Sequence, residues 1–173
     1  MSQQHNAEVF RTVMEEAFGK GNVAALDGLF ASDAKEHQFG MPSTVEGLKG
    51  SIMSLRAAFP DLTLTVEEVV TDGDMVWGRA TARGTHRGPF MGMTPTNKQF
   101  AIQVFDMCKF DNGRIVEHWG VPDRFALLAQ LGALPRQGQG TQKERAEQPG
   151  QPAQIQAEQP SAQGTQATQT RAS

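Results

Sequence analysis

The chain has 173 residues, a net charge of -3 and a single cysteine. One cysteine excludes an internal disulfide framework and any multi-cysteine zinc site. The slightly acidic balance, without a basic cluster, argues against a nucleic-acid partner. The sequence has neither a membrane-length apolar run nor a signal-peptide core, so we expect a soluble cytoplasmic protein with no membrane partner.

The first third of the chain is predicted to be mainly helical. Apolar side chains recur at helical spacing over residues 8–18, and two nearby glycines end that pattern. A second short helix is expected over residues 23–30, and a short strand over 34–39. Ser43 or Thr44 can then cap a third helix that ends near Ala58, because a hydroxyl just before the first turn accepts a hydrogen bond from a free backbone N–H.

The middle of the chain predicts strands that are joined by turns. Residues 62–67 alternate between apolar and polar side chains, which is typical of a half-buried strand. Residues 72–74 form a turn, and 75–86 form a second long strand. A loop over 87–98 follows, with apolar side chains between glycines and a proline.

A hairpin over residues 103–120 and a helix over residues 123–131 complete the domain, which we assign to residues 1–135. Asp123 is expected to cap the last helix. Helices first and hairpin-linked strands afterwards predict an α+β fold. In this fold a curved antiparallel sheet wraps around the N-terminal helices and leaves one hydrophobic pocket.

Residues 136–173 differ in composition from the rest of the chain. They contain eleven glutamines, no aromatic residue and one large aliphatic residue, Ile155. Such a segment cannot bury enough apolar surface to offset the entropy lost on ordering it. We therefore expect a disordered, glutamine-rich tail.

The hairpin carries an aspartate and a histidine whose relative position depends on the turn. Asn112-Gly113 between two apolar-rich runs is a strong hairpin signal. A two-residue turn would place Asp106 opposite Trp119, whereas a three-residue turn with a glycine bulge would place it opposite His118. The second register is favoured, because Asp-Asn followed by Gly suits a type I turn plus bulge. It brings the carboxylate and the imidazole onto one face of the sheet.

Several short motifs follow one another in an order that resembles a known family. They are Phe59-Pro60-Asp61-Leu62, Gly84-Thr85-His86-Arg87-Gly88, Phe90-Met91-Gly92-Met93-Thr94-Pro95-Thr96, the hairpin segment 111–119, and Leu127-Leu128-Ala129-Gln130-Leu131-Gly132. In these motifs the chain resembles the SnoaL-like polyketide cyclases, also known as ester cyclases, of the nuclear transport factor 2-like superfamily. The resemblance covers residues 6–134.

The resemblance implies a cone-shaped α+β fold with a hydrophobic pocket. It also implies ring closure by intramolecular aldol condensation, without a metal or an organic cofactor. In the family pattern an aspartate directly after the His-Trp pair is the general acid/base, and that place is Gly120 here. Because members of the family associate through the sheet, the resemblance implies a homodimer or a homotetramer.

His118 and Asp106 are the candidate catalytic pair. A carboxylate beside a histidine fixes its tautomer and raises its pKa, which makes the imidazole a better base near neutral pH. The alternative is a buried structural pair that satisfies two polar groups. The histidines lack the spacing of metal ligands, so no metal site is assigned. Substrate contacts are assigned to six further residues: His37, His86, Phe90, Met93, Val104 and Gly120.

Most of these pocket residues also have a simpler interpretation. His86 either lines the pocket mouth or caps a turn, and His37 lies on a strand whose inward face is unassigned. Phe90 and Met93 form either a lid between flanking glycines or part of the core. Val104 is expected opposite Gly120, on the same face as the candidate pair.

Three functions remain open at this point. The first is a cofactor-free, cyclase-like enzyme acting on a small hydrophobic ligand that bears a carbonyl, with His118 as the base. The second is a non-catalytic module that binds small molecules, which the missing aspartate at Gly120 favours. The third is an epoxide hydrolase or isomerase-type pocket enzyme, for which Arg79 and Asp106 would need a further aspartate.

Overall fold

The computed structural model describes residues 2–134, so the predicted tail lies outside the described residues. Helix α1 (Gln3–Arg11) runs directly into the π-helical segment η1 (Thr12–Gly19). Together they form the predicted first helix, which begins earlier than the apolar pattern indicated. Its buried side chains repeat along one face, as an amphipathic helix requires: Val9, Phe10, Val13, Met14 and Ala17.

The second predicted helix is wrong in length. Only a single 3-10 turn forms, η2 (Val23–Leu26), and strand β1 (Phe30–Glu36) already starts where the helix was expected to end. Asp27 has an extended backbone and Gly28 a positive φ of 76°. The chain therefore leaves the helical conformation directly after η2, since glycine adopts the left-handed region without steric cost.

Helix α2 (Val45–Ala58) begins and ends where it was predicted. Thr44 caps it, and its Oγ1 accepts a hydrogen bond from Gly47 N at 3.1 Å. Near the other end, Arg56 donates hydrogen bonds of 2.8–2.9 Å to the backbone carbonyls of Gly19, Pro60 and Leu62. These bonds hold α2 against the end of η1 and the start of the sheet.

Five strands form one sheet in the order β1-β5-β4-β3-β2. The long strands are β2 (Thr63–Asp72), β3 (Met75–Thr85), β4 (Gln99–Asp111) and β5 (Arg114–Pro122). They pair antiparallel, as predicted, but β1 pairs with β5 in parallel. The sheet is thus mixed, because a long crossover through the rest of the domain lets the first strand join the last one in parallel.

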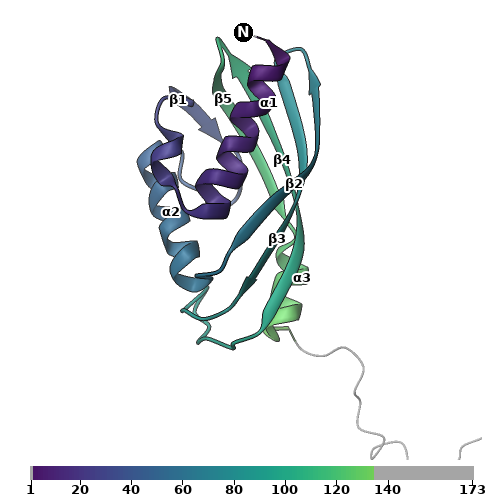
Figure 1. The fold of residues 1–173 in the computed structure, drawn as a ribbon. Helices are drawn as coiled ribbons and strands as arrows, with labels where there is room; N and C mark the ends of the chain where they lie inside the picture. The colour runs from purple at the N-terminus through teal and green to yellow at the C-terminus, as the bar shows by residue number, and fades with distance from the viewer. Residues whose placement is uncertain (1, 135–173) are drawn as a thin grey trace, which may run out of the picture. The chain divides into compact units, whose positions relative to one another are not determined.

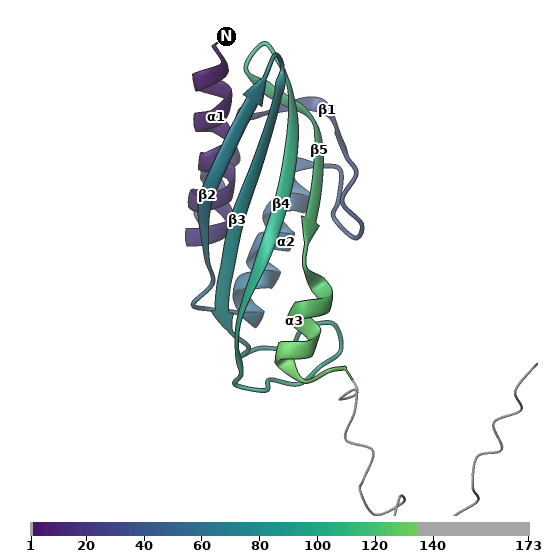
Figure 2. The ribbon, with the colours of Figure 1, turned by 90° about the vertical axis from the view of Figure 1, so that its right-hand side faces the viewer.

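The helices α1 and α2 cover one face of the twisted sheet, and α3 (Arg124–Leu131) lies at the end of β5 (Figures 1 and 2). Between the helices and the sheet lies the apolar core, which includes the fully buried Phe10, Ile52 and Ile115. The predicted α+β class is therefore confirmed. No helix within residues 2–134 combines the length and apolar character that crossing a membrane requires.

Neither predicted register of the β4–β5 hairpin is correct. Asn112 and Gly113, with φ of 48° and 77°, form a two-residue turn, and Asp111 pairs with Arg114. Positive φ at both positions suits the turn type that matches the twist of a hairpin. A bulge then adds one residue, Val116, to β5 and shifts all later pairs.

As a consequence of the bulge, Asp106 lies opposite Gly120, and Cys108 lies opposite His118. Val104 pairs with Pro122, so its predicted pairing with Gly120 is also wrong. Asp106 and His118 nevertheless remain on one face of the sheet, because residues two apart along a strand share a face.

Candidate functional site

The candidate site begins with a carboxylate at the end of the edge strand. Glu36 is the last residue of β1 and pairs with His118 of β5 in the parallel register. Glu36 Oε2 lies 2.8 Å from His118 Nδ1. The sequence prediction missed Glu36, because only the pairing of β1 with β5 reveals that it faces the histidine.

The second ring nitrogen of His118 faces another carboxylate. His118 Nε2 lies 3.4 Å from Asp106 Oδ1, and the side chains of Glu36, Asp106 and His118 are only 7%, 6% and 14% exposed. Carboxylates accept hydrogen bonds, and only a protonated imidazole donates from both nitrogens. The geometry therefore favours an imidazolium held between two carboxylates, a group of net charge -1.

The protonation of His118 follows from two opposing effects. Burial lowers the pKa of His118, while the hydrogen bonds and charges of Asp106 and Glu36 raise it; the carboxylates prevail and the pKa rises from 6.5 to about 9. His118 accordingly carries its proton at neutral pH.

Gly120 does not have a positive φ, so its backbone conformation does not require a glycine. A Cβ atom at Gly120 would lie 2.5 Å from Asp106 Oδ1 and would collide with Gln38 Oε1. The space beside the position that carries the acid/base aspartate in the family pattern is therefore filled by the ends of two side chains, one from β4 and one from the segment after β1. One of them, Asp106, is itself a carboxylate.

A cavity of about 340 Å³ lies between β1, β5 and the start of α2. Glu36 and His118 line it, together with apolar side chains that include Phe30, Leu48 and Ile115. This volume is in the range of small-molecule sites. The wall also carries the charged residues Lys35, Glu46 and Arg114, so a ligand in the cavity would meet the imidazolium within a wall of mixed character.

The substrate contacts predicted at His86, Phe90 and Met93 lie away from this cavity. His86 is fully buried, and its Nδ1 lies 3.1 Å from Thr96 Oγ1. Its ring packs near Phe59 and Phe90, with centroids 5.5 and 6.3 Å apart. Phe90 N and Met93 N each donate to the carbonyl of the other residue, and both side chains pack against the core. None of His86, Phe90 and Met93 lines the cavity described above.

The remaining predicted contacts surround the site without lining the cavity. His37 stacks on Trp119 with ring centroids 4.6 Å apart, and its Nε2 lies 3.1 Å from Glu117 Oε2. Val104 is buried in the core. Gly120 touches the site through the space it leaves for Asp106.

The predicted cap of the last helix is confirmed, and the single cysteine has a structural role. The side chain of Asp123 caps α3 and accepts a hydrogen bond from Ala126 N at 2.8 Å. Cys108 is 2% exposed, and burial raises its pKa well above the ordinary value, so it is a neutral core residue. Within residues 2–134, no group of three or more histidine, cysteine or acidic side chains is arranged to hold a metal ion.

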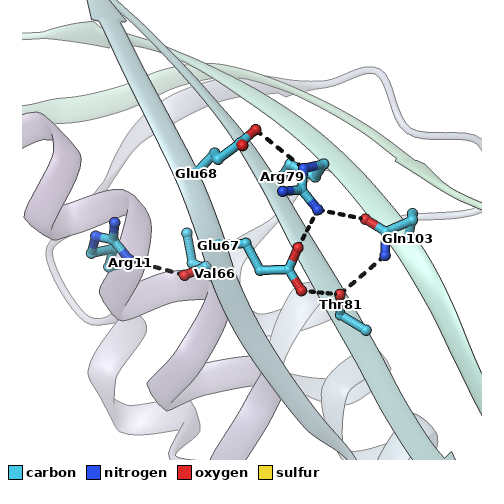
Figure 3. Close-up of polar contacts among 7 residues, drawn as sticks. All are labelled: Arg11, Val66, Glu67, Glu68, Arg79, Thr81 and Gln103. Carbon is cyan, nitrogen blue, oxygen red and sulfur yellow. Dashed lines mark hydrogen bonds and ion pairs between the residues drawn. The ribbon is translucent and has the colours of Figure 1, made fainter.

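Arg79 lies on the outer face of the sheet, the face turned away from α1 and α2. It pairs with Glu67, donates to Glu68 Oε2 and Gln103 Oε1 at 3.2 Å each, and is drawn with these partners in Figure 3. Its cross-strand partner is Phe105, which is exposed, and not Asp106, which is buried. The Arg79–Asp106 combination expected of an epoxide hydrolase does not form.

Many solved structures resemble this chain, and TsrD, IdmH and AclR are three of them. TsrD from Streptomyces laurentii is 24% identical with a TM-score of 0.71, and the match covers 78% of this chain and 99% of TsrD. IdmH from Streptomyces antibioticus, proposed to be a polyketide cyclase, is 39% identical with a TM-score of 0.64 over 73% of this chain and 98% of IdmH. AclR from Streptomyces galilaeus, proposed to be a hydroxylase, is 26% identical with a TM-score of 0.69 over 78% and 100%.

The similarity to TsrD shows the fold alone, while the identity to IdmH extends over nearly the whole of that protein. The comparison with curated proteins gave no match. The family model described as SnoaL-like polyketide cyclase matches residues 8–131, which is most of the domain. The chain belongs to the SnoaL-like polyketide cyclase family.

Proposed function

We propose that the protein is a cofactor-free enzyme that performs aldol-type ring closure, or a related proton transfer at carbon, on a small hydrophobic carbonyl compound. The observation that carries this proposal is the His118 imidazolium, held between Glu36 and Asp106 at the wall of the cavity. Such a group places a proton donor and a carboxylate base side by side, as acid/base chemistry at carbon requires.

In this proposal Asp106 is the base, in place of His118, and the substrate reaches it past His118, because Asp106 does not itself line the cavity. His118 keeps its proton at neutral pH, because its pKa is raised to about 9. A protonated imidazole cannot accept the substrate proton, whereas the neighbouring carboxylate can. Glu36 holds Nδ1 of the ring at 2.8 Å and so fixes its orientation.

The proposed reaction regenerates both groups. Asp106 takes the proton from the carbon next to a carbonyl, and the C–H electron pair forms the enolate. The enolate carbon attacks a second carbonyl carbon of the same molecule, and the resulting alkoxide takes the proton of His118 Nε2. Asp106 then returns its proton to His118, so ring closure isomerises the substrate without oxidant or reductant.

The cavity would contribute to catalysis by positioning the two reacting carbons of the substrate. Holding both reacting carbons in one space of about 340 Å³ turns ring closure into a prearranged step. Such positioning contributes roughly 7–11 kcal/mol in favourable cases. The apolar residues of the wall suit the hydrophobic part of such a ligand, and the charged ones suit its polar groups.

The proposal is tested with α-tetralone, an apolar ketone, by following the loss of its α-proton NMR signal in D2O. The wild-type protein should accelerate exchange, and Asp106→Asn and His118→Ala should each reduce that acceleration by about 100-fold or more. Asp72→Asn, on an exposed aspartate at the end of β2, is the matched control and should exchange like wild type. Wild-type exchange rates in Asp106→Asn would show that the assignment is wrong.

The second candidate is a non-catalytic binding module, and Gly120 is the observation that favours it. In the family pattern this place holds the acid/base aspartate. Binding of α-tetralone that shifts the NMR signals of His118, without any acceleration of exchange, would support the module and exclude the enzyme for this ligand.

We also propose that the protein forms a homodimer or a homotetramer through the outer face of the sheet. Four large apolar side chains on this face are 52–67% exposed: Val70, Trp77, Phe105 and Val121. Exposed apolar residues gathered on one face are typical of protein interfaces. Arg79 and its partners Glu67, Glu68 and Gln103 lie beside them (Figure 3). These polar side chains would make the contact between subunits specific.

A further inference from the structure

The cavity lies where strand β1 separates from strand β5. The two strands pair at Phe30–Ile115 and again at Lys35–Glu117, so five steps along β1 correspond to only two steps along β5. The stretch of β1 between these pairs is not paired with β5, and three of its residues line the cavity. Arg114 lies next to the first pair and Lys35 belongs to the second. A cation therefore flanks the opening at each end.

Both cations line the cavity, and in the described part of the chain neither of them forms an ion pair. Each has an acid directly opposite in the sheet, which is Asp111 for Arg114 and Glu117 for Lys35. Glu117 is engaged elsewhere, because its Oε2 lies 3.1 Å from His37 Nε2. The acids across the ladder therefore do not neutralise the two cations of the cavity.

The two carboxylates of the cavity wall, Glu36 and Glu46, are already bound by other groups. Glu36 Oε2 lies 2.8 Å from His118 Nδ1, and Glu36 Oε1 accepts a hydrogen bond of 2.7 Å from Gln38 N. Glu46 Oε1 accepts a hydrogen bond of 2.8 Å from Lys49 Nζ. The ions of the wall that remain without a protein partner are thus both cations, and a cleft with this balance attracts anions.

We propose that the substrate is a keto acid whose carboxylate binds between Arg114 and Lys35 while its ketone faces His118. This inference rests on the proposed function and names its substrate class. Arginine binds a carboxylate through two parallel hydrogen bonds, and lysine adds a point charge. Both cations are exposed, so the carboxylate would lie at the mouth of the cavity. Ile115, between Arg114 and His118 along β5, would contact the hydrophobic part of the ligand.

The test compares 6-carboxy-α-tetralone with its methyl ester, which has the same rings but no charge. Isothermal titration calorimetry measures both affinities at low and at high salt. The wild-type protein should bind the acid at least about 10-fold more tightly than the ester, because hydrogen bonds between charged groups are the stronger ones. The difference should shrink as salt is added, since salt screens exposed charges.

The double variant Arg114→Gln with Lys35→Gln should bind the acid and the ester equally well. The matched control is Arg83→Gln with Arg87→Gln, which removes the same charge from two exposed arginines that do not line the cavity. This control should keep the preference for the acid. Circular dichroism verifies that each variant is folded.

The proposal is overturned if the wild-type protein binds neither ligand, if it binds both equally, or if the double variant still prefers the acid. These outcomes differ from a failure of the proposed function. A preference for the acid that depends on the two cations, without any acceleration of α-tetralone exchange, would support a carboxylate site in a protein that is not an enzyme for this ligand. Accelerated exchange without a preference for the acid would remove the keto acid alone.

Discussion

At the scale of single residues, His118 dominates the site because both of its nitrogens face buried carboxylates. Burying three charged groups costs desolvation energy, and replacing such groups by apolar ones is often neutral or stabilising. The three buried charged groups are therefore not explained by stability alone. They keep a protonated imidazole next to a carboxylate base, which is the role proposed for them.

The raised pKa of His118 predicts how stability depends on pH. The folded pKa of about 9 exceeds the ordinary value of 6.5. The stabilisation is thus fully present below 6.5 and is lost as the pH rises through 9. The loss should be at most about 3 kcal/mol, from 1.36 kcal/mol for each pKa unit.

The measurement is the free energy of unfolding in urea between about pH 6 and about pH 10. His118→Gln is the control, because it keeps a polar side chain but does not titrate. The wild-type value should fall across this range more steeply than that of the variant. Equal slopes for the two proteins would contradict the protonation state assigned to His118.

At the scale of elements, local signals were sufficient for most of the fold. Thr44 and Asp123 cap the helices they were expected to cap, because capping depends only on residues within one turn. The α+β class followed from the order of periodic patterns along the chain. The parallel pairing of β1 with β5 joins residues about eighty positions apart in the sequence, and no local sequence pattern predicts it. For this reason Glu36 was missed.

The hairpin register depends on one residue, Val116, which the sequence does not mark as a bulge. The Asn-Gly turn was recognised, but each predicted register assumed an uninterrupted ladder on both sides of it. The bulge changes which residues face each other without changing the turn. Sequence reasoning therefore placed Asp106 and His118 on one face, where the structure also has them, but through the wrong register.

Deleting Val116 should leave Asp106 and His118 on one face. Without the extra residue the ladder continues from Phe110–Ile115 to Lys109–Glu117 and Cys108–His118, the same pairs that form around the bulge, so the later side chains of β5 keep their faces. The pKa of His118 should therefore remain raised, at about 9. NMR titration of the imidazole measures this value, with Val116→Ala, which keeps the bulge, as the control. A fall towards 6.5 in the deletion variant would contradict the register argument.

At the scale of the whole described domain, the two faces of the sheet have different surroundings and different proposed roles. The inner face packs against α1 and α2 and carries the site, with Asp106 buried on it. The outer face alternates with it along each strand and exposes Trp77 and Phe105 to solvent. A sheet that is apolar on both faces is costly in water unless something covers the second one. Self-association would bury that face and leave the site on the opposite face accessible.

Phe105 lies at the centre of this outer face, since its cross-strand partners are Arg79 of β3 and Val121 of β5. Phe105→Glu should weaken self-association at least 10-fold, because it places a charge in a contact of roughly 1,200–2,000 Å². Sedimentation velocity over a range of protein concentrations measures the change. Phe125→Glu is the matched control, because Phe125 is 71% exposed but lies on α3. A wild-type protein that stays monomeric, or a Phe105→Glu variant that associates like wild type, would show that the outer face does not hold the subunits together.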